Sequence, residues 1–137
     1  MSAPTEPLVA FEDRDNIHVG TIRASSVLSA GNVAEFGNEV LAHIAAHPGG
    51  NLVLNFEHVD YLSSAVLNEL LRINKAVAKG GGQLRLCAVS EVILEVFQIT
   101  NLDKLFTIHS DDLESDLKRF RRSLEIAAQE AAWDDPL

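Results

Sequence analysis

An apolar run and a helical pattern are joined in this chain by the sequence Val59–Asp60–Tyr61–Leu62–Ser63–Ser64–Ala65–Val66–Leu67. The preceding run, Leu52–Phe56, is almost wholly apolar, which is typical of a parallel strand covered on both faces. The helical pattern ends at Gly80–Gly82. Two serines therefore stand where a strand leads into a helix, beside unpaired backbone N–H groups and the positive end of the helix dipole. A hydroxyl at this place can cap the helix, and it can equally carry a phosphate.

Upstream of this junction the sequence predicts a hairpin and a helix. Leu8–Glu12 and Ile17–Arg23 are short β-like runs on either side of Asp13–Asn16, whose polar residues favour a turn. Asn32, followed three residues later by Glu35, resembles a capping box at the start of a helix. A Pro-Gly-Gly sequence ends this helix, whose apolar spacing is formed by Val33, Phe36, Val40, Leu41 and Ile44.

The helix that follows the two serines is predicted to be amphipathic. One side carries Leu67, Leu70, Leu71, Asn74 and Val77. The opposite side therefore faces water or a partner, and it carries Glu69, Arg72, Lys75 and Lys79.

Three further elements and a long helix complete the pattern. Leu84–Val89 indicates a third buried strand, and Leu105–Ile108 an edge strand. Between them Glu91–Ile99 predicts a short helix whose inward residues are Val92, Ile93, Val96 and Phe97. A last helix is expected to begin near Asp111, with Glu114 completing a second box-like pair. We expect its apolar seam to pack on the sheet, although it could pair with a second copy of the chain; the seam is Leu113, Leu117, Phe120 and Leu124.

These elements predict one α/β domain with a small mixed β-sheet, in which an opening hairpin is followed by α-β repeats and about four helices pack on the sheet. Residues 1–7 are polar and proline-bearing and are expected to form a flexible tail. The domain is predicted to span residues 8–128, and the acidic residues 129–137 a frayed tail. The sequence shows no internal repeat and no second domain.

Composition limits the classes of function. The chain has 137 residues, of which 47% are hydrophobic, and this is enough for one core. No apolar run approaches the ~20 residues that cross a bilayer, so no membrane insertion is expected. The net charge of −9 argues against nucleic acid and anionic membranes as partners. The single cysteine, Cys87, excludes an internal disulfide and is consistent with the cytoplasm.

Motifs for catalysis are largely missing. The sequence contains neither a G-x-x-x-x-G-K-S/T phosphate loop nor a G-x-S-x-G elbow. His58, Asp60 and Ser64 are close in sequence, but their spacing does not imply the geometry of a catalytic triad. We therefore do not expect an enzyme. The hypothesis of an enzyme that binds a small molecule or a nucleotide ranks last.

Metal ligands and cofactors are not predicted either. His43 and His47 are four residues apart on a helix, but the sequence pairs them with no third ligand. Both are expected in the last helical turn, where histidine is favourable beside the dipole, so we interpret them as surface or capping residues. His18 and His109 carry no signal, and Cys87 is interpreted as a small core residue.

The order of elements from Leu52 to Phe106 resembles the STAS domain family of anti-sigma factor antagonists. In that family an apolar strand leads through aromatic–apolar–Asp–Ser–Ser–Gly–Leu into a helix that ends in Gly–Gly. A strand, a short helix and an apolar–Thr–Gly–Leu-like turn then lead to the last strand. Here the corresponding segments are Leu52–Phe56, Tyr61–Leu67, Gly81–Gly82, Leu84–Val89, Glu91–Ile99 and Ile99–Phe106.

The resemblance implies a partner-switching protein. Such a protein binds an anti-sigma serine kinase and so frees a sigma factor, until the kinase phosphorylates a serine at the helix start; a PP2C-type phosphatase restores binding. Alignment on Leu62 and Leu67 puts the phosphorylated serine on Ser64, with Ser63 as the alternative. The implied docking surface, as we call it below, consists of Tyr61, Leu62, Ser63, Ser64, Ala65, Asn68, Glu69 and Arg72.

Three positions depart from the family pattern. The acid before the switch serine is Ser63, the glycine is Val66, and the acid at the end of the preceding strand is Asn55. Residue physics alone favours capping over phosphorylation for the two serines, since capping serines are common. The alternative function is therefore a constitutive STAS module of a signalling assembly or transporter, with no phosphorylation.

Overall fold

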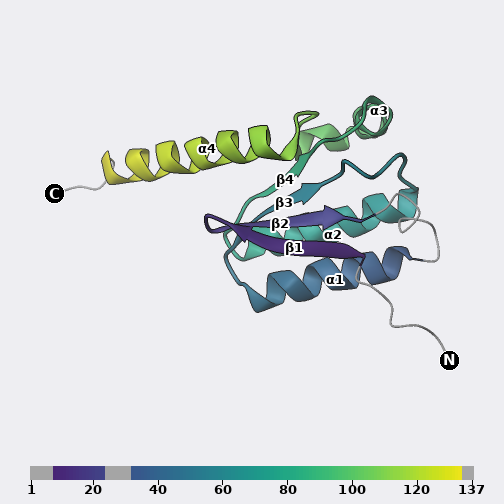
Figure 1. The fold of residues 1–137 in the computed structure, drawn as a ribbon, viewed down its shortest axis with the longest axis horizontal. Coiled ribbons are helices and arrows are strands. Elements are labelled where there is room, and N and C mark those ends of the chain that lie inside the picture. The colour runs from purple at the N-terminus through teal and green to yellow at the C-terminus, as the bar shows by residue number, and fades with distance from the viewer. Residues whose placement is uncertain (1–7, 24–31, 134–137) are drawn as a thin grey trace.

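A five-stranded sheet forms the centre of the molecule (Figure 1). The computed structural model describes residues 8–23 and 32–133, so the predicted tail at residues 1–7 lies outside the described residues. The strands lie in chain order, with β1 antiparallel to β2 and the other neighbours parallel. This is the predicted mixed sheet with an opening hairpin; its strands are β1 (Val9–Arg14), β2 (Ile17–Ile22), β3 (Asn51–Asn55), β4 (Leu84–Cys87) and β5 (Thr107–Ile108).

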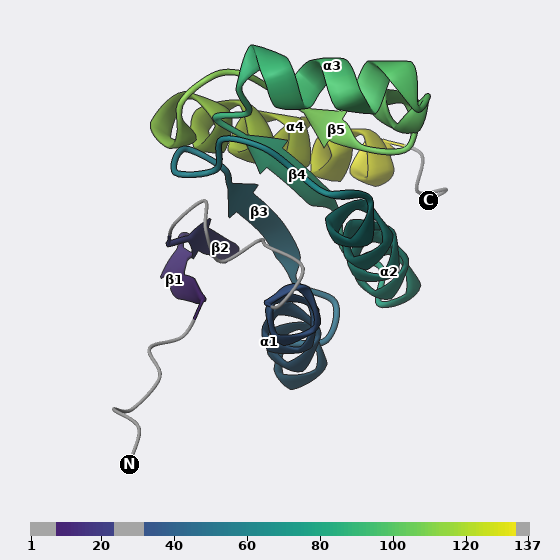
Figure 2. The ribbon, with the colours of Figure 1, turned by 90° about the vertical axis from the view of Figure 1, so that its right-hand side faces the viewer.

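Helices cover both faces of the sheet. Figures 1 and 2 show α1 and α2 on one side and α4 on the other, and α3 packs into the same core as α1 and α2. A 3-10 turn, η2 (Leu102–Lys104), connects α3 to the edge strand β5. The described chain thus has the four predicted helices, which are α1 (Val33–Ala46), α2 (Ser64–Lys79), α3 (Glu91–Ile99) and α4 (Leu113–Trp133).

Strand β3 is buried on both faces, as its apolar sequence predicts. Leu52 and Leu54 belong to the larger core cluster, which the sheet forms with α1, α2 and α3. Val53 points to the opposite face and belongs to a smaller cluster under α4. That smaller cluster confirms that the seam of the last helix packs on the sheet, and its buried members are Ile17, Val19, Val53, Cys87, Leu117 and Phe120.

The structure corrects several predicted boundaries at the amino-terminal end. The first hairpin strand continues two residues further than predicted, to Arg14, while the second begins at Ile17 as predicted. The turn is therefore the two residues Asp15 and Asn16, with φ of 56° and 71°. Positive φ at both turn residues matches the twist of the two strands, and Asp and Asn tolerate it. The capping box predicted at Asn32 is wrong, because Asn32 has a helical backbone conformation and its side chain makes no capping hydrogen bond.

Other corrections concern the carboxyl-terminal half. Val92 is 60% exposed, so its predicted inward position is wrong; only Ile93 and Phe97 of α3 are fully buried. The box predicted for Asp111 and Glu114 does not form. Asp112 Oδ1 instead accepts a hydrogen bond of 3.1 Å from the backbone N–H of Ser115. Helix α4 continues past Ala128 to Trp133, and residues 134–137 lie outside the described residues.

A helix that crosses a bilayer needs about 20 predominantly apolar residues. Among residues 8–23 and 32–133, no helix combines this length with this apolarity.

Candidate docking and phosphorylation site

The loop between β3 and α2 is held in place by the buried side chain of Asn55. Its Oδ1 accepts the backbone N–H of Glu57 at 3.1 Å, and its Nδ2 donates to Glu57 Oε1 at 3.0 Å. A longer contact of 3.5 Å joins Nδ2 to the hydroxyl of Thr21 on β2. An amide suits this place because it offers a donor and an acceptor at once, whereas a carboxylate only accepts. Asn55, one of the three departures, therefore organises the loop that leads to the serines.

Ser63 is the N-cap of α2. Its backbone is extended, with φ −89° and ψ 165°, and its Oγ accepts the backbone N–H of Val66 at 3.3 Å. The bond satisfies one of the N–H groups that a helix start leaves without an intrahelical partner. Val66 itself is fully buried inside the helix, so valine in place of glycine is accommodated by the core.

Ser64 is the first residue of α2, and its side chain is exposed. Within the described residues no protein group makes a hydrogen bond with its hydroxyl. The two neighbouring serines therefore have different surroundings: Ser63 caps the helix, whereas Ser64 is exposed.

Only some of the other side chains of the docking surface are exposed to solvent. Tyr61 is 52% exposed, and Ala65, Asn68 and Arg72 are exposed along α2. Since Ser64, Asn68 and Arg72 are spaced by four residues, they form one stripe along the helix. Figure 1 shows α2 beside α1 beneath the sheet, with the start of the helix at the end of the molecule where β3 terminates.

Two members of the docking surface pack inward instead. Leu62 lies against the larger core cluster. The side chain of Glu69 is 14% exposed and accepts a hydrogen bond of 2.8 Å from Arg72. Glu69 also lies so close to Gly37 of α1 that a Cβ on Gly37 would collide with its carboxylate. Glu69 therefore helps to pack the two helices and holds the guanidinium of Arg72 at the surface.

The candidate triad finds no support in the described residues, where no hydrogen bond or ion pair links His58, Asp60 and Ser64. His58 is instead 3.7 Å from Glu57. Burial raises the pKa of the Cys87 thiol to about 12, and the nearby Asp116 carboxylate adds to the effect. A thiol that stays protonated at neutral pH is a poor nucleophile, in agreement with a core role for Cys87.

Histidines 43 and 47 do find a third histidine, which the sequence did not indicate. His43 Nε2 lies 3.1 Å from His18 Nδ1, and His47 Nδ1 lies 3.0 Å from the backbone carbonyl of His43. The second contact agrees with the capping role predicted for His47. Burial lowers the pKa of His43, and the neighbouring His47 and His18 lower it further. No periodicity could have revealed His18, because it comes from a strand that precedes the helix.

A second cluster that the sequence did not indicate lies under α4. Arg85 of β4 and Asp116 of α4 are both buried, with 3.6 Å between Nη2 and Oδ1. Arg85 Nη2 also lies 2.9 Å from His109 Nε2, and its guanidinium lies over the ring of Phe120 at 4.8 Å. The sequence gives little indication of this pair. It shows only an arginine in an otherwise apolar strand and an acid near the start of a helix.

Comparison with known proteins identifies the family. Residues 9–115 match the model of the STAS domain. The chain belongs to the STAS domain family, which confirms the resemblance found in the sequence.

Solved structures share the fold. A putative anti-sigma factor antagonist from Thermotoga maritima is 20% identical, with a TM-score of 0.74 over 82% of this chain and 94% of that chain. An anti-sigma factor antagonist from Mycobacterium paratuberculosis is 23% identical, with a TM-score of 0.71 over 88% of this chain and 99% of that chain. The murine Solute Carrier 26 family member A9 anion transporter is 13% identical, with a TM-score of 0.68 over 81% of this chain and 18% of the transporter.

Proposed function

We propose that this chain is an anti-sigma factor antagonist that binds an anti-sigma serine kinase through the docking surface, and that phosphorylation of Ser64 ends this binding. The released kinase then holds its sigma factor inactive, and a PP2C-type phosphatase removes the phosphate. The chain acts in the cytoplasm as a binding protein. It performs no catalysis, and neither a nucleic acid nor a membrane takes part.

The observation that carries this proposal is the division of roles between the two serines. Ser63 uses its hydroxyl to cap α2, at 3.3 Å from the N–H of Val66, whereas Ser64 is exposed at the first helical position. Asp and Ser are about equally good N-caps, so serine in place of the family's acid retains the cap. What it removes is one negative charge beside the acceptor hydroxyl.

A phosphate on Ser64 is compatible with the fold. It adds about −1.5 to −2 charge next to the positive end of the α2 dipole, where anions are stabilised by about 0.3–1 kcal/mol per charge at exposed positions. The first turn of α2 contains no acidic residue that would repel it. Phosphorylation is therefore expected to leave the domain folded.

The same phosphate opposes docking. Ser64 lies at one end of the exposed stripe that continues through Asn68 to Arg72, with the exposed ring of Tyr61 close by in the chain. A partner that covers this stripe would have to remove the phosphate dianion from water. Its surface is complementary to the unmodified serine and does not pair with the phosphate, so this desolvation is costly. Affinity for the partner is expected to fall much more than stability of the domain.

The test begins with phosphosite mapping by mass spectrometry on the protein isolated from its native cells, with and without stress. We expect phosphate on Ser64 whose occupancy changes with the condition. Pull-down from the same cells should then recover a serine kinase with Ser64→Ala and recover little of it with Ser64→Glu. Recombinant kinase obtained in this way gives the affinities directly.

The matched control is Ser90→Ala. Ser90 caps α3 in the way that Ser63 caps α2, with its Oγ 3.3 Å from the N–H of Ile93, but it lies outside the docking surface. Equal affinity of the wild type, Ser64→Ala and Ser64→Glu for the kinase would reject the switch. Unmodified serines under every condition would instead favour the constitutive STAS module, for which the fold shared with a transporter is the supporting observation.

A further inference from the structure

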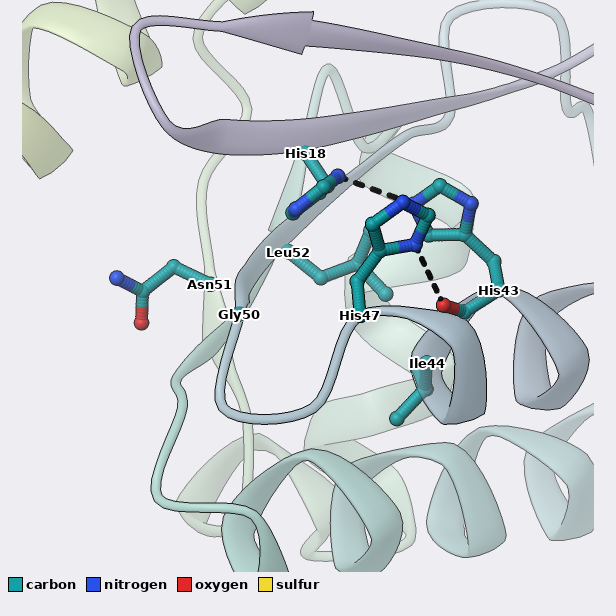
Figure 3. Close-up of a pocket in the computed structure, with 7 residues that line it drawn as sticks. All are labelled: His18, His43, Ile44, His47, Gly50, Asn51 and Leu52. Carbon is teal, nitrogen blue, oxygen red and sulfur yellow. Dashed lines mark hydrogen bonds between the residues drawn. The ribbon is translucent and has the colours of Figure 1, made fainter.

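Three imidazoles meet at the end of the sheet opposite to Ser64. His18 lies near the start of β2, where it pairs with Leu52 of β3, and His43 and His47 lie at the end of α1. Figure 3 shows the three rings turned toward one another, His18 from the hairpin and the other two from the helix. One ring nitrogen of each residue lies within 4.8 Å of those of the other two.

A hydrogen bond orients the ring of His47 as the ring of a metal ligand is oriented. The carbonyl oxygen of His43 can only accept, so His47 Nδ1, at 3.0 Å, must donate and therefore carries the proton. His47 Nε2 is then left with its lone pair. A ring N–H donated to a backbone carbonyl is the usual outer-shell contact of a histidine that binds a metal.

The other two histidines share a proton that a metal ion would replace. His43 Nε2 and His18 Nδ1 are 3.1 Å apart, so one of them donates to the other. If the donor ring carries its proton on its other ring nitrogen instead, both of these neighbouring nitrogens have a lone pair for a metal ion. The ring of His43 is further held by parallel stacking on Phe11, with 3.9 Å between the ring centroids and 2° between the planes.

The dimensions suit a tetrahedral ion. Zn–N bonds are about 2.0–2.1 Å long, so two ligands of one tetrahedral ion stand roughly 3.3 Å apart. Nε2 of His43 and Nδ1 of His18 are already near that separation, at 3.1 Å. The ring of His47 is exposed and has room to turn until its nitrogen is as close to the other two. The rings line a small pocket of about 10 Å³, close to the space of one water molecule, together with Ile44, Gly50, Asn51 and Leu52.

We propose that His18, His43 and His47 form a Zn²⁺ site that joins the β1–β2 hairpin to the end of α1. Imidazole nitrogen is a favoured ligand of Zn²⁺, and three histidines leave the fourth tetrahedral position to water. Because the site fastens two elements that are separate in the chain, bound metal should stabilise the fold. It lies at the amino end of the parallel strands, whereas Ser64 follows their carboxyl end, so the metal does not contact the docking surface.

The experiment is a titration of the tag-free, metal-depleted protein with Zn²⁺, followed by calorimetry and by thermal unfolding. We expect one ion per chain and a rise in the unfolding midpoint that EDTA reverses, while Mg²⁺ has no effect. Loss of an outer-shell partner alone weakens metal sites about 10–100-fold, so His47→Gln should weaken Zn²⁺ binding by at least about 100-fold. His47 is exposed at the helix end, so this variant is expected to fold. His18→Gln should have the same effect.

The matched control is His58→Gln, which removes an exposed histidine at the opposite end of the sheet. Its affinity for Zn²⁺ should equal that of the wild type, and Co²⁺ bound to the wild type should show the strong visible absorption of a tetrahedral ion. Equal loss of affinity in His58→Gln and His47→Gln would overturn the proposal. So would the absence of stoichiometric Zn²⁺ binding by the wild type. These measurements of Zn²⁺ binding do not depend on phosphorylation of Ser64. The Zn²⁺ site and the phosphorylation switch can therefore be rejected independently of each other.

Discussion

The two faces of the sheet are closed by different kinds of side chain. Under α1, α2 and α3 the core is a continuous apolar cluster that includes Phe36 and Leu70, both fully buried. Under α4 the apolar cluster is small, and it lies beside the buried pair Arg85 and Asp116. In the described residues neither oxygen of Asp116 has a hydrogen-bond partner.

The difference indicates where the stability of the domain resides. Apolar burial stabilises by about 25 cal/mol per Å² without any requirement for pairing, so the first face gains from each side chain it covers. On the second face, the attraction between Arg85 and Asp116 has to offset the loss of hydration of both charges, and such pairs often contribute little net stability. Burial raises the pKa of Asp116, against the opposing influence of Arg85 and His109. We therefore expect the packing of α4 on the sheet to contribute less to the free energy of unfolding than the packing of α1 and α2.

The largest effect is expected from Phe36→Ala on the first face. Removal of a fully buried phenyl ring from a close-packed core costs about 3–5 kcal/mol of the free energy of unfolding. Urea denaturation followed by circular dichroism measures the loss. Ile99→Ala is the control, because Ile99 is 74% exposed on α3 and its truncation should change stability by less than about 0.5 kcal/mol. A loss below about 1 kcal/mol for Phe36→Ala would contradict the assignment of the main core to this face.

The next effect tests the polar pair on the second face. Asp116→Ala leaves Arg85 as a buried cation without its acid, and we expect a loss of about 3 kcal/mol. This is the low end for such pairs, because His109 can still accept a hydrogen bond from Arg85. The same denaturation experiment measures it.

The double variant Arg85→Met/Asp116→Leu measures the net contribution of the ion pair to the free energy of unfolding. Replacement of both charges by apolar groups of similar size is often neutral or stabilising by about 1–4 kcal/mol. We expect a stability equal to or above that of the wild type. A double variant as unstable as Asp116→Ala would mean that the ion pair itself stabilises this face, and the contrast between the faces would disappear.

The same contrast explains which parts of the molecule the sequence predicts. A continuous apolar run predicted β3, and apolar periodicity predicted α2 and α3, because each element buries a set of side chains that is local in the sequence. Arg85 and Asp116 could not be paired from the sequence, since they are brought together only by the packing of α4 on β4. The histidine cluster escaped prediction for the same reason.

The site of the two serines was predictable from the sequence only in part. The strand–loop–helix order located the junction, because it is a local feature of the chain. The sequence could not assign the cap, since Ser63 and Ser64 are equally suited by residue type and differ only in backbone conformation. Val92 shows the limit of periodicity in a short helix, where an apolar residue next to a buried one is still exposed.

A smaller effect separates the two serines on the first face. Ser63→Ala removes the cap of α2 and should cost about 1 kcal/mol, whereas Ser64→Ala should change stability by less than about 0.5 kcal/mol. Differential scanning calorimetry of the two variants at the same concentration makes the comparison. A larger loss in Ser64→Ala than in Ser63→Ala would show that the capping roles are reversed.

The smallest effect concerns pH and the second face. Burial lowers the pKa of His109 below its ordinary value of 6.5, and Arg85 and Arg119 lower it further, while Asp116 and Asp111 act in the opposite direction. Arg119 Nη1 lies 3.0 Å from Nδ1 of this ring and Arg85 Nη2 lies 2.9 Å from Nε2. The protonated ring would therefore direct an N–H at a guanidinium on each side, and a guanidinium cannot accept a hydrogen bond.

The sign of the effect follows from which state binds the proton. Below pH 6.5 the unfolded chain protonates this histidine while the folded chain resists, so the stabilising contribution of neutral His109 is present above pH 6.5 and declines as the pH falls through 6.5 toward the lowered pKa. Urea midpoints at pH 7.5 and pH 5.5 for the wild type and His109→Gln measure it, and the wild type should lose more on acidification. His58→Gln is the control, because it removes an exposed histidine that contacts Glu57 and does not belong to the cluster of Arg85, His109 and Asp116. This variant should keep the pH dependence of the wild type. If His109→Gln lost as much stability as the wild type, the cluster under α4 would not hold this histidine neutral, and the second face would be less sensitive to charge than its buried residues indicate.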